Sequence, residues 1–185
     1  HLLEASVRGK VVLVTGAGGS IGSELCRQIV LLGATRLVLL ERNEFALYSI
    51  DRELRGTRAG RSAELVPVLG DAGDAERLVQ ICRHHGIATI FHAAAYKHVP
   101  MVEANLCAGV ANNTAAREAR VERLTLISTD KAVRPTNAMG ASKRVCELLI
   151  QAADAESTPG GPILSMVRFG NVLGSSGSVI PLFHH

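Results

Sequence analysis

The sequence predicts a doubly wound α/β domain with a parallel sheet, that is, a Rossmann fold. Short runs of β-branched residues and leucine alternate with segments of helical spacing along most of the 185 residues. A glycine-rich turn joins the first of these runs to the first helical segment. Because such alternation requires right-handed crossovers, we expect parallel strands with helices on both faces of the sheet.

The expected strands are short apolar runs, which are typical of strands buried on both faces. They lie at residues 11–14, 37–40, 65–69, 89–92, 124–128 and 163–167. Helices are expected at residues 24–32, 45–54, 75–85 and 137–153. Gly33 is the predicted C-cap of the first helix.

One further helix is expected to end near Arg120. The segment 110–120 is short for a helix that must cross the sheet, by roughly a turn or two. Either the chain lacks these turns, or a segment is missing from the sequence.

The composition is that of one globular domain, with 47% hydrophobic and 20% charged residues. The net charge of +3 suits small anionic ligands, and no basic run is interleaved with aromatic residues as nucleic-acid binding requires. No apolar stretch reaches the roughly 18 to 20 residues of a membrane helix. No signal peptide is recognisable, so a cytoplasmic protein is expected. We assign residues 1–183 to one domain with the Rossmann fold and treat His184 and His185 as tag remnants.

Four cysteines are widely separated, and no two of them form a CxxC pair. They are Cys26, Cys82, Cys107 and Cys146. A metal site is therefore not expected, and free buried thiols in a reducing compartment are the expected state.

The glycines of the first turn have the spacing of a dinucleotide-binding site. Gly16 allows a tight turn, Gly19 lets the backbone approach a pyrophosphate, and Gly22 lets the helix pack against the strand. Ser20 and Ile21 stand at the start of the helix, where N–H groups and the helix dipole favour an anion. In this strand–turn–helix context the turn predicts a dinucleotide cofactor.

Residues after the second and third strands are expected to select the cofactor. Glu41 lies about 20 residues beyond the glycines, where a carboxylate accepts hydrogen bonds from the ribose and repels a 2′-phosphate. This favours NAD, while Arg42 could accommodate a 2′-phosphate and keeps NADP as the alternative. Asp71 and Ala72 are expected beside the adenine, and the alternative for Asp71 is a helix N-cap.

Three alanines follow the fourth strand: Ala93, Ala94 and Ala95. Their small side chains suit a close approach of the backbone to the cofactor, with tight packing as the alternative.

Several motifs together resemble one family. They are the glycine turn at 11–22, FHAAAYKHVP at 91–100, ISTDKA at 127–132, RPTNAMGASK at 134–143 and VRFGNVLGSSGSVIP at 167–181. The chain resembles the UDP-N-acetylglucosamine 4,6-dehydratases of bacterial polysaccharide biosynthesis, within the extended short-chain dehydrogenase/reductase superfamily. The resemblance covers residues 8–183.

Members of this family continue into a smaller C-terminal lobe, so the resemblance implies that this chain is the Rossmann part of a longer enzyme. Alone it is expected to bind the cofactor with little catalysis, because substrate alignment supplies several kcal/mol of the rate enhancement. Many relatives carry membrane helices ahead of this domain, which leaves an inner-membrane anchor of a longer protein open.

The resemblance places the acid–base chemistry at Thr129, Asp130 and Lys131. Asp130 would protonate the departing 6-hydroxyl, Lys131 would take the proton from carbon 5, and Thr129 would hydrogen-bond the oxygen on carbon 4. NAD would take a hydride from carbon 4 and return it to carbon 6.

Met139 stands where most of the superfamily has the tyrosine of a Tyr-x-x-x-Lys pair, and Lys143 is the lysine of that pair. The spacing puts both on one helix face. Lys143 is expected to bind the ribose of the nicotinamide. Met139 cannot transfer a proton, so the 4-hydroxyl would be deprotonated by Thr129 through a water or by Lys143.

The resemblance also implies substrate contacts from Lys97, His98 and Asn171. Asn112 or Asn113 is expected to hold a structural water, and Arg168 to form a structural ion pair. The expected partner is a UDP-sugar, without nucleic acid or a membrane contact, and a homo-oligomer is left open. The alternatives to a dehydratase are a sugar-nucleotide 4-epimerase and a non-catalytic NAD-binding module.

Overall fold

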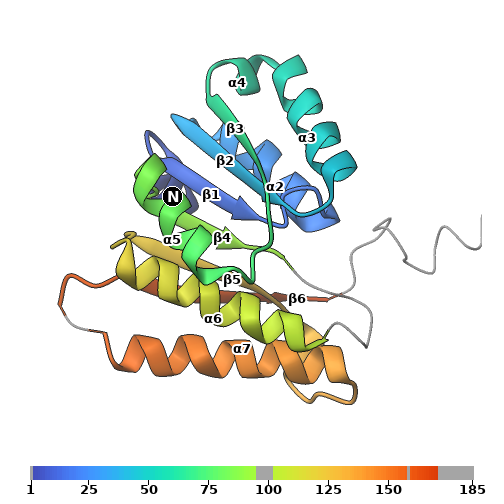
Figure 1. Ribbon diagram of the computed structural model, residues 1–185, viewed down its shortest axis with the longest axis vertical. Coiled ribbons are helices and arrows are strands. Elements are labelled where there is room, and N and C mark those ends of the chain that lie inside the picture. Colours follow the sequence, from blue (N-terminus) through green and yellow to red (C-terminus); the bar gives the residue numbers. More distant parts are fainter. Residues whose placement is uncertain (1, 95–101, 158, 171–185) are drawn as a thin grey trace, which may run out of the picture.

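A parallel sheet forms the centre of the protein (Figure 1). The computed structural model describes residues 2–94, 102–157 and 159–170. Within these residues the sheet has six strands in the order β3-β2-β1-β4-β5-β6, and each neighbouring pair is parallel. The strands are β1 (Val11–Thr15), β2 (Arg36–Glu41), β3 (Glu64–Leu69), β4 (Thr89–His92), β5 (Arg123–Thr129) and β6 (Ile163–Phe169). The order reverses between β1 and β4, which is where open α/β sheets bind their ligands.

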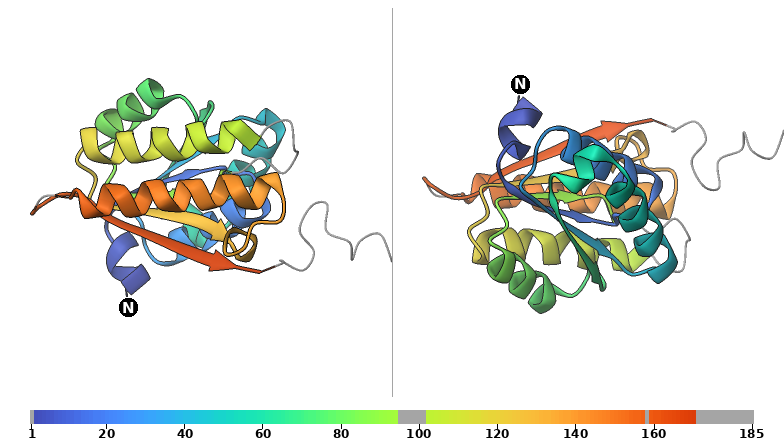
Figure 2. Two further views of the ribbon diagram at one scale, coloured as in Figure 1. Left: turned by 90° about the horizontal axis from the view of Figure 1, so that it is seen from below. Right: turned by 90° about the horizontal axis from the view of Figure 1, so that it is seen from above.

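Helices cover both faces of the sheet (Figure 2). They are α1 (Leu2–Val7), α2 (Ser20–Leu31), α3 (Glu44–Gly56), α4 (Arg58–Arg61), α5 (Ala75–His85), α6 (Val102–Glu118) and α7 (Ala138–Ala155), with a 3₁₀ helix η2 (Asp130–Ala132) after β5. One core cluster joins the sheet to α5, α6 and α7. A second cluster joins it to α2 and α3 on the opposite face. The predicted doubly wound architecture is thus confirmed.

Each predicted strand is present, and most predicted element ends lie within a few residues of the observed ones. The C-cap of α2 is Leu32 and not Gly33 as predicted; Gly33 follows it with φ +84° and donates its N–H to the carbonyl oxygen of Val30 at 3.2 Å. The helices α1 and α4 and the 3₁₀ helix η2 were not predicted, because they are too short to show a periodic pattern.

The prediction of a short helix at 110–120 is wrong, because α6 begins at Val102 and has 17 residues. Among the α6 side chains that are described, most of the buried ones are alanines: Ala108, Ala111, Ala115 and Ala116. Alanines contrast little with their neighbours in hydropathy, so the helical period is weak in the sequence. Small residues also allow a close approach: a Cβ on Gly109 would lie 2.8 Å from Sγ of Cys146 on α7.

The end of α6 has an unusual backbone. Arg120 has φ +54°, the single non-glycine residue with positive φ in the described part of the chain. Its N–H donates to the carbonyl oxygen of Arg117 at 3.3 Å, and the N–H of Val121 donates to that of Ala116 at 3.0 Å. These two bonds form a helix-ending turn in which glycine is the usual residue.

Candidate functional site

The glycine turn after β1 brings backbone segments unusually close together. Gly16 has φ +70°, and a Cβ there would lie 2.7 Å from Cα of Ala94, which follows β4. A Cβ on Gly22 would lie 1.9 Å from the carbonyl oxygen of Gly16. The turn, the start of α2 and the segment after β4 therefore meet backbone to backbone at the switch point of the sheet. This leaves a surface of peptide groups that a phosphate can approach.

The first turn of α2 differs from those of three other helices. Asn43, Asp74 and Asn137 cap α3, α5 and α7 with side-chain oxygens that accept first-turn N–H groups. The N-cap of α2 is Gly19, which has no side chain to do so. Ser20, Ile21 and Gly22 are the first residues of this helix. The glycine cradle and the helix start together fit a pyrophosphate, as the sequence predicts.

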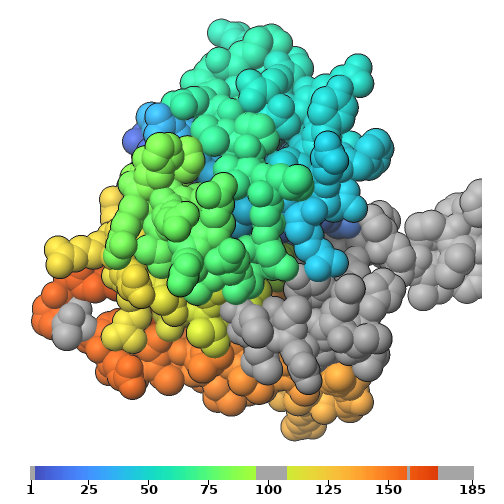
Figure 3. Space-filling view, in the orientation of Figure 1, coloured from blue at the N-terminus to red at the C-terminus, as the bar shows by residue number. Residues whose placement is uncertain are grey.

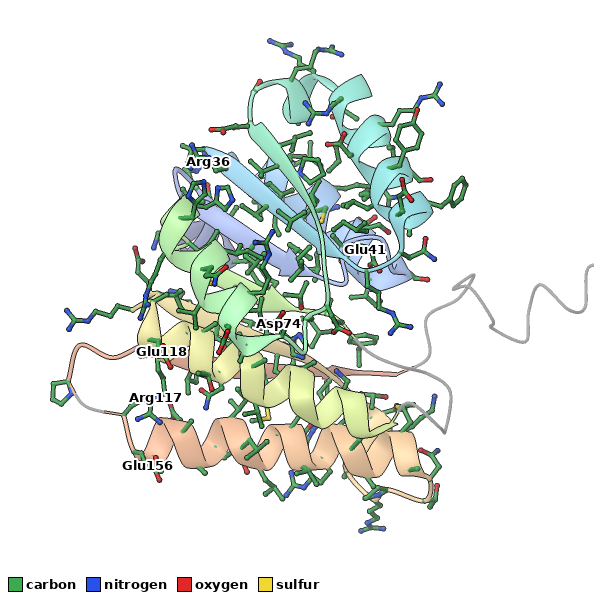
Figure 4. All side chains as sticks on the ribbon, in the orientation of Figure 1. Arg36, Glu41, Asp74, Arg117, Glu118 and Glu156 are labelled. Atoms are coloured by element: carbon green, nitrogen blue, oxygen red, sulfur yellow. The ribbon has the colours of Figure 1, made fainter. Side chains whose placement is uncertain are left out.

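Glu41 closes the cradle from the end of β2. Its Oε2 accepts the N–H of Gly18 at 3.1 Å, and its Oε1 accepts the N–H groups of Arg42 and Asn43 at 3.0 Å each. Figure 4 shows Glu41 at one end of β2, with Arg36 at the other. The carboxylate is thereby oriented beside the glycine turn, where a bound ribose is expected.

The loop after β3 carries Asp71 and Ala72. Oδ1 of Asp71 accepts the N–H of Gly73 at 2.7 Å, which shapes the loop. The helix cap is Asp74 and not Asp71, so the alternative interpretation of Asp71 as an N-cap is wrong. Nδ2 of Asn112 on α6 donates to the carbonyl oxygen of Ala72 at 3.3 Å and fixes this loop to the helix layer.

A buried pair that the sequence did not reveal lies between β1 and β4. Oγ1 of Thr15 is 2.7 Å from Nδ1 of His92, and both side chains are buried. Burial, with the nearby charge of Lys143, lowers the pKa of His92 well below its usual value, so its ring is neutral. The signal available in the sequence was a histidine at the end of a buried strand, which more often indicates a structural residue.

Lys143 lies against the ends of two strands. Its Nζ donates to the carbonyl oxygens of Ala94 and Ile127, each at 3.3 Å, and only 4% of the residue is exposed. Burial lowers the pKa of its ammonium group. Met139 stands one turn earlier on α7 and is partly buried. The Met-x-x-x-Lys face of α7 thus lies at the carboxyl edge of the sheet, next to the glycine cradle.

Thr129, Asp130 and Lys131 lie at the carboxyl end of β5, as predicted. The Thr129 hydroxyl donates to Oδ1 of Asp130 at 3.0 Å, and the N–H of Lys131 donates to Thr129 Oγ1 at 3.4 Å. A Cβ on Gly140 would lie 2.4 Å from the carbonyl oxygen of Lys131. The start of α7 is therefore packed directly against this turn. Asp130 and Lys131 are both exposed and adjacent, as an acid and a base that share one substrate must be.

Two asparagines of α6 have buried amide oxygens without a hydrogen-bond partner in the described part of the chain. These are Oδ1 of Asn112 and Oδ1 of Asn113. Each could accept a hydrogen bond from a water, which is compatible with the predicted structural water.

The predicted ion pair of Arg168 is present, and its partner is Glu147. Nε and Nη2 of Arg168 donate to the two carboxylate oxygens at 2.7 and 2.6 Å. Sequence reasoning missed Glu147, because a glutamate in a helix is usually a solvated residue.

Four predicted site residues, Ala95, Lys97, His98 and Asn171, lie outside the residues whose side chains are described. Within the described part, Cys26, Cys82 and Cys146 are buried and form no disulfide, as expected. No group of metal-ligating side chains is found among the described residues. The helices described there include none with the length and apolar character needed to span a membrane.

Comparison with known sequences identifies a family and several relatives. The model of a family described as "Polysaccharide biosynthesis protein" matches residues 12–185. The capsular polysaccharide biosynthesis protein CapD of Staphylococcus aureus is 43% identical over 190 residues, which cover 98% of this chain and 31% of CapD. The UDP-glucose 4-epimerase of Rickettsia prowazekii is 33% identical over 186 residues, covering 95% of this chain and 53% of that enzyme. The chain thus spans about a third to a half of the length of these curated relatives.

Solved structures agree on the fold. Pen from Bacillus thuringiensis superposes with a TM-score of 0.85 at 29% identity, covering 96% of this chain and 55% of Pen. A UDP-glucose 4-epimerase from Stenotrophomonas maltophila, solved with NAD and formylated UDP-arabinopyranose, superposes with a TM-score of 0.73. It is 22% identical and covers 93% of this chain and 60% of its own, so this likeness supports the fold alone.

Proposed function

Since the chain belongs to the family of polysaccharide biosynthesis proteins, we propose that it is the NAD-binding and catalytic domain of a sugar-nucleotide 4,6-dehydratase. Its substrate in this proposal is UDP-N-acetylglucosamine, and its product is a UDP-4-keto-6-deoxy sugar. The observation that carries the proposal is the position of Asp130 and Lys131. They form an exposed acid–base pair at the end of β5, beside the switch point where the glycine cradle lies.

The residues described above fit NAD. The glycine cradle and the first turn of α2 would hold the pyrophosphate, Glu41 the adenosine ribose, and Asp71 the adenine. Lys143 would bind the nicotinamide ribose from α7. When bound, the nicotinamide supplies the acceptor and donor of the hydride.

The remaining chemistry is proton transfer, which falls to the side chains after β5. Lys131 takes the proton from carbon 5, and Asp130 protonates the 6-hydroxyl, which leaves as water. Lys131 then returns its proton to carbon 5 when the hydride adds to carbon 6. Thr129, whose hydroxyl is already oriented towards Asp130, holds the oxygen on carbon 4. An acid and a base on one 3₁₀ turn can serve one face of the sugar in the two halves of the elimination.

The 4-hydroxyl needs a base of its own, since Met139 has no proton to transfer. Lys143 is favoured by its buried position, because burial lowers its pKa and increases the neutral fraction. Thr129 acting through a water stays the alternative.

A 4-epimerase is the second candidate, and the identity of 33% to such an enzyme supports it. Epimerisation passes through the same 4-keto oxidation level but loses no water. It therefore gives Asp130 and Lys131 no elimination to perform, which favours the dehydratase. A non-catalytic NAD-binding module is the third candidate.

Product analysis separates these candidates. The longest natural form of the protein that contains these residues is incubated with NAD⁺ and UDP-N-acetylglucosamine and followed by NMR. We expect a 4-keto-6-deoxy sugar, and a loss of turnover of about 10² to 10⁴-fold in Lys131→Ala. Lys10→Ala is the control, because Lys10 pairs with Glu122 at the amino ends of β1 and β5, away from the proposed site at their carboxyl ends. A 4-epimer would contradict the dehydratase, and NAD binding without turnover would indicate the binding module.

A further inference from the structure

Glu147 on α7 is a completely buried acid that makes four hydrogen bonds. Its Oε1 accepts from Oγ of Ser128 at 2.7 Å and from Nε of Arg168 at 2.7 Å. Its Oε2 accepts from Nη2 of Arg168 at 2.6 Å and from Nη1 of Arg144 at 3.0 Å. A carboxylate offers about four acceptor positions, so this one is fully used.

The cluster is ionised and rigid. Arg168 is the main cause that lowers the pKa of Glu147 to about 2, so the acid is charged at any physiological pH. Arg168 contacts it through two parallel hydrogen bonds, the geometry with the highest directional specificity for a carboxylate. A buried ion pair is weak evidence for stability, since an apolar replacement is often as stable. A role in placing the surrounding segments is therefore the more informative interpretation.

Each partner in the cluster is close to a residue of the proposed site. Ser128 directly precedes Thr129 at the end of β5. Glu147 stands one helical turn after Lys143 on the same helix. Arg168 lies two residues before Gly170, where an added Cβ would be 3.6 Å from Oδ2 of Asp130.

The carboxylate of Glu147 therefore links β5, β6 and α7 through a single side chain. The backbone contact between Gly140 and the Lys131 carbonyl joins two of them, α7 and η2. It does not include β6, which lies at the edge of the sheet next to β5. The Glu147 carboxylate thus joins β6 and α7 at the end of β5, in addition to the parallel pairing of β5 with β6.

We propose that Glu147 is a positioning residue that sets the distance between the acid–base pair after β5 and Lys143 on α7. It does so by joining Ser128, Arg144 and Arg168 through its carboxylate. It contacts neither substrate nor cofactor and acts through the backbone of β5 and β6. This inference rests on the proposed function of the site.

Glu147→Gln tests it, because glutamine keeps the shape and removes the charge. Glu53→Gln is the matched control: Glu53 accepts two hydrogen bonds from Arg27, at 2.6 and 3.0 Å, between α3 and α2 and away from β5. We expect Glu147→Gln to lower kcat about 100-fold, as a displacement of about 1 Å can do, while KM for the sugar nucleotide changes less than about threefold. Glu53→Gln should leave both constants unchanged.

A purely structural role would reduce the amount of folded enzyme and leave kcat per folded molecule unchanged, and this result would overturn the inference. Amide hydrogen exchange gives a second measurement that needs no turnover. Glu147→Gln should accelerate exchange at residues 128–132 without changing it in β1 and β2, and Glu53→Gln should not affect residues 128–132. Equal exchange at residues 128–132 in wild type and Glu147→Gln would also overturn the inference. If the wild type makes no 4-keto sugar, the dehydratase is wrong, and the exchange result alone decides the role of Glu147.

Discussion

The two halves of the sheet differ in the chemical groups that form their parts of the proposed site, which are backbone groups in one half and buried side chains in the other. The half formed by β1, β2 and β3 surrounds the cofactor cradle, and the half formed by β4, β5 and β6 carries the proposed catalytic residues. Figure 3 shows them as two regions, with blue to cyan atoms of the first half above yellow to orange atoms of the second. Among the described residues, most of the buried polar side chains belong to the second half, including Lys143 and Glu147.

The first half relies on its backbone. The proposed phosphate site consists of peptide groups brought close by Gly16 and Gly22, and the charged residues of this half pair mainly at the surface, as Arg27 does with Glu53. The second half relies on polar side chains that are buried away from water and therefore need hydrogen-bond partners within the protein. Binding a phosphate requires room for the backbone, whereas proton transfer requires side chains held at defined distances.

Gly22→Ala should have the largest effect of these changes. We expect this effect to be confined to the half of the sheet formed by β1, β2 and β3. Its Cβ would lie 1.9 Å from the Gly16 carbonyl oxygen, so the backbone of the turn must move. We expect a loss of about 3 kcal/mol in the free energy of unfolding. NAD affinity should fall by about 100-fold or more, that is, about 2.7 kcal/mol. Urea denaturation and calorimetric titration measure these two quantities.

Gly86→Ala is the control for this change. Gly86 also has positive φ, +63°, but no atom lies within 4 Å of an added Cβ. It should cost about 1 kcal/mol of stability and leave NAD binding intact. Equal NAD affinity in wild type and Gly22→Ala would contradict the backbone cradle.

Low pH should reduce the free energy of unfolding through Glu147, which lies in the half of the sheet that carries the proposed catalytic residues. Its pKa is about 2 in the folded protein against an ordinary value of 4.5. Its contribution is therefore complete above pH 4.5 and is lost as the pH falls towards 2, because the unfolded chain takes up the proton first. The free energy of unfolding of wild type minus that of Glu147→Gln should shrink by roughly 2 to 3 kcal/mol across this window. Urea titrations at successive pH values measure it, and a difference that does not depend on pH would refute the assignment.

Glu41→Gln tests whether the half of the sheet formed by β1, β2 and β3 selects NAD over NADP. The amide keeps one acceptor but loses the charge that, in the proposed site, holds the ribose and repels a 2′-phosphate. We expect NAD affinity to fall about tenfold, or about 1.4 kcal/mol, with a smaller loss for NADP. Arg42→Gln, in turn, should weaken NADP alone. Fluorescence titration of both cofactors checks these changes, and an unchanged ratio of the two affinities would show that Glu41 does not select the cofactor.

The smallest effect is expected at Arg120, where the backbone is locally strained at the end of α6. Its φ of +54° costs a side-chain-bearing residue roughly 1 kcal/mol relative to glycine. Arg120→Gly should therefore raise the free energy of unfolding by about 1 kcal/mol at most, since glycine also gains entropy in the unfolded chain. The change should leave NAD binding untouched. Thermal unfolding measures the gain, and a loss of stability would mean that the guanidinium makes contacts worth more than the strain.

Prediction from sequence succeeded where the signal is local. The glycine turn after β1, Glu41 at the end of β2 and the STDK segment after β5 each lie where they were predicted, because each signal spans only a few neighbouring residues, while their roles stay proposals. It failed for α6, whose alanine face shows little hydropathy contrast. It also missed the role of Glu147, whose partners Ser128 and Arg168 lie 19 and 21 residues away, and the Thr15–His92 pair, whose members are 77 residues apart.

The sequence by itself determined the strand–helix alternation, the cofactor turn and the residue types available for acid–base chemistry. These follow from local periodicity and from side-chain identity. Tertiary structure alone decided that Lys143 contacts the carbonyl oxygens of Ala94 and Ile127, and that Glu147 joins β5, β6 and α7. The physical reason is that a buried charge must find its hydrogen-bond partners wherever the packing brings them, and the packing involves the whole chain.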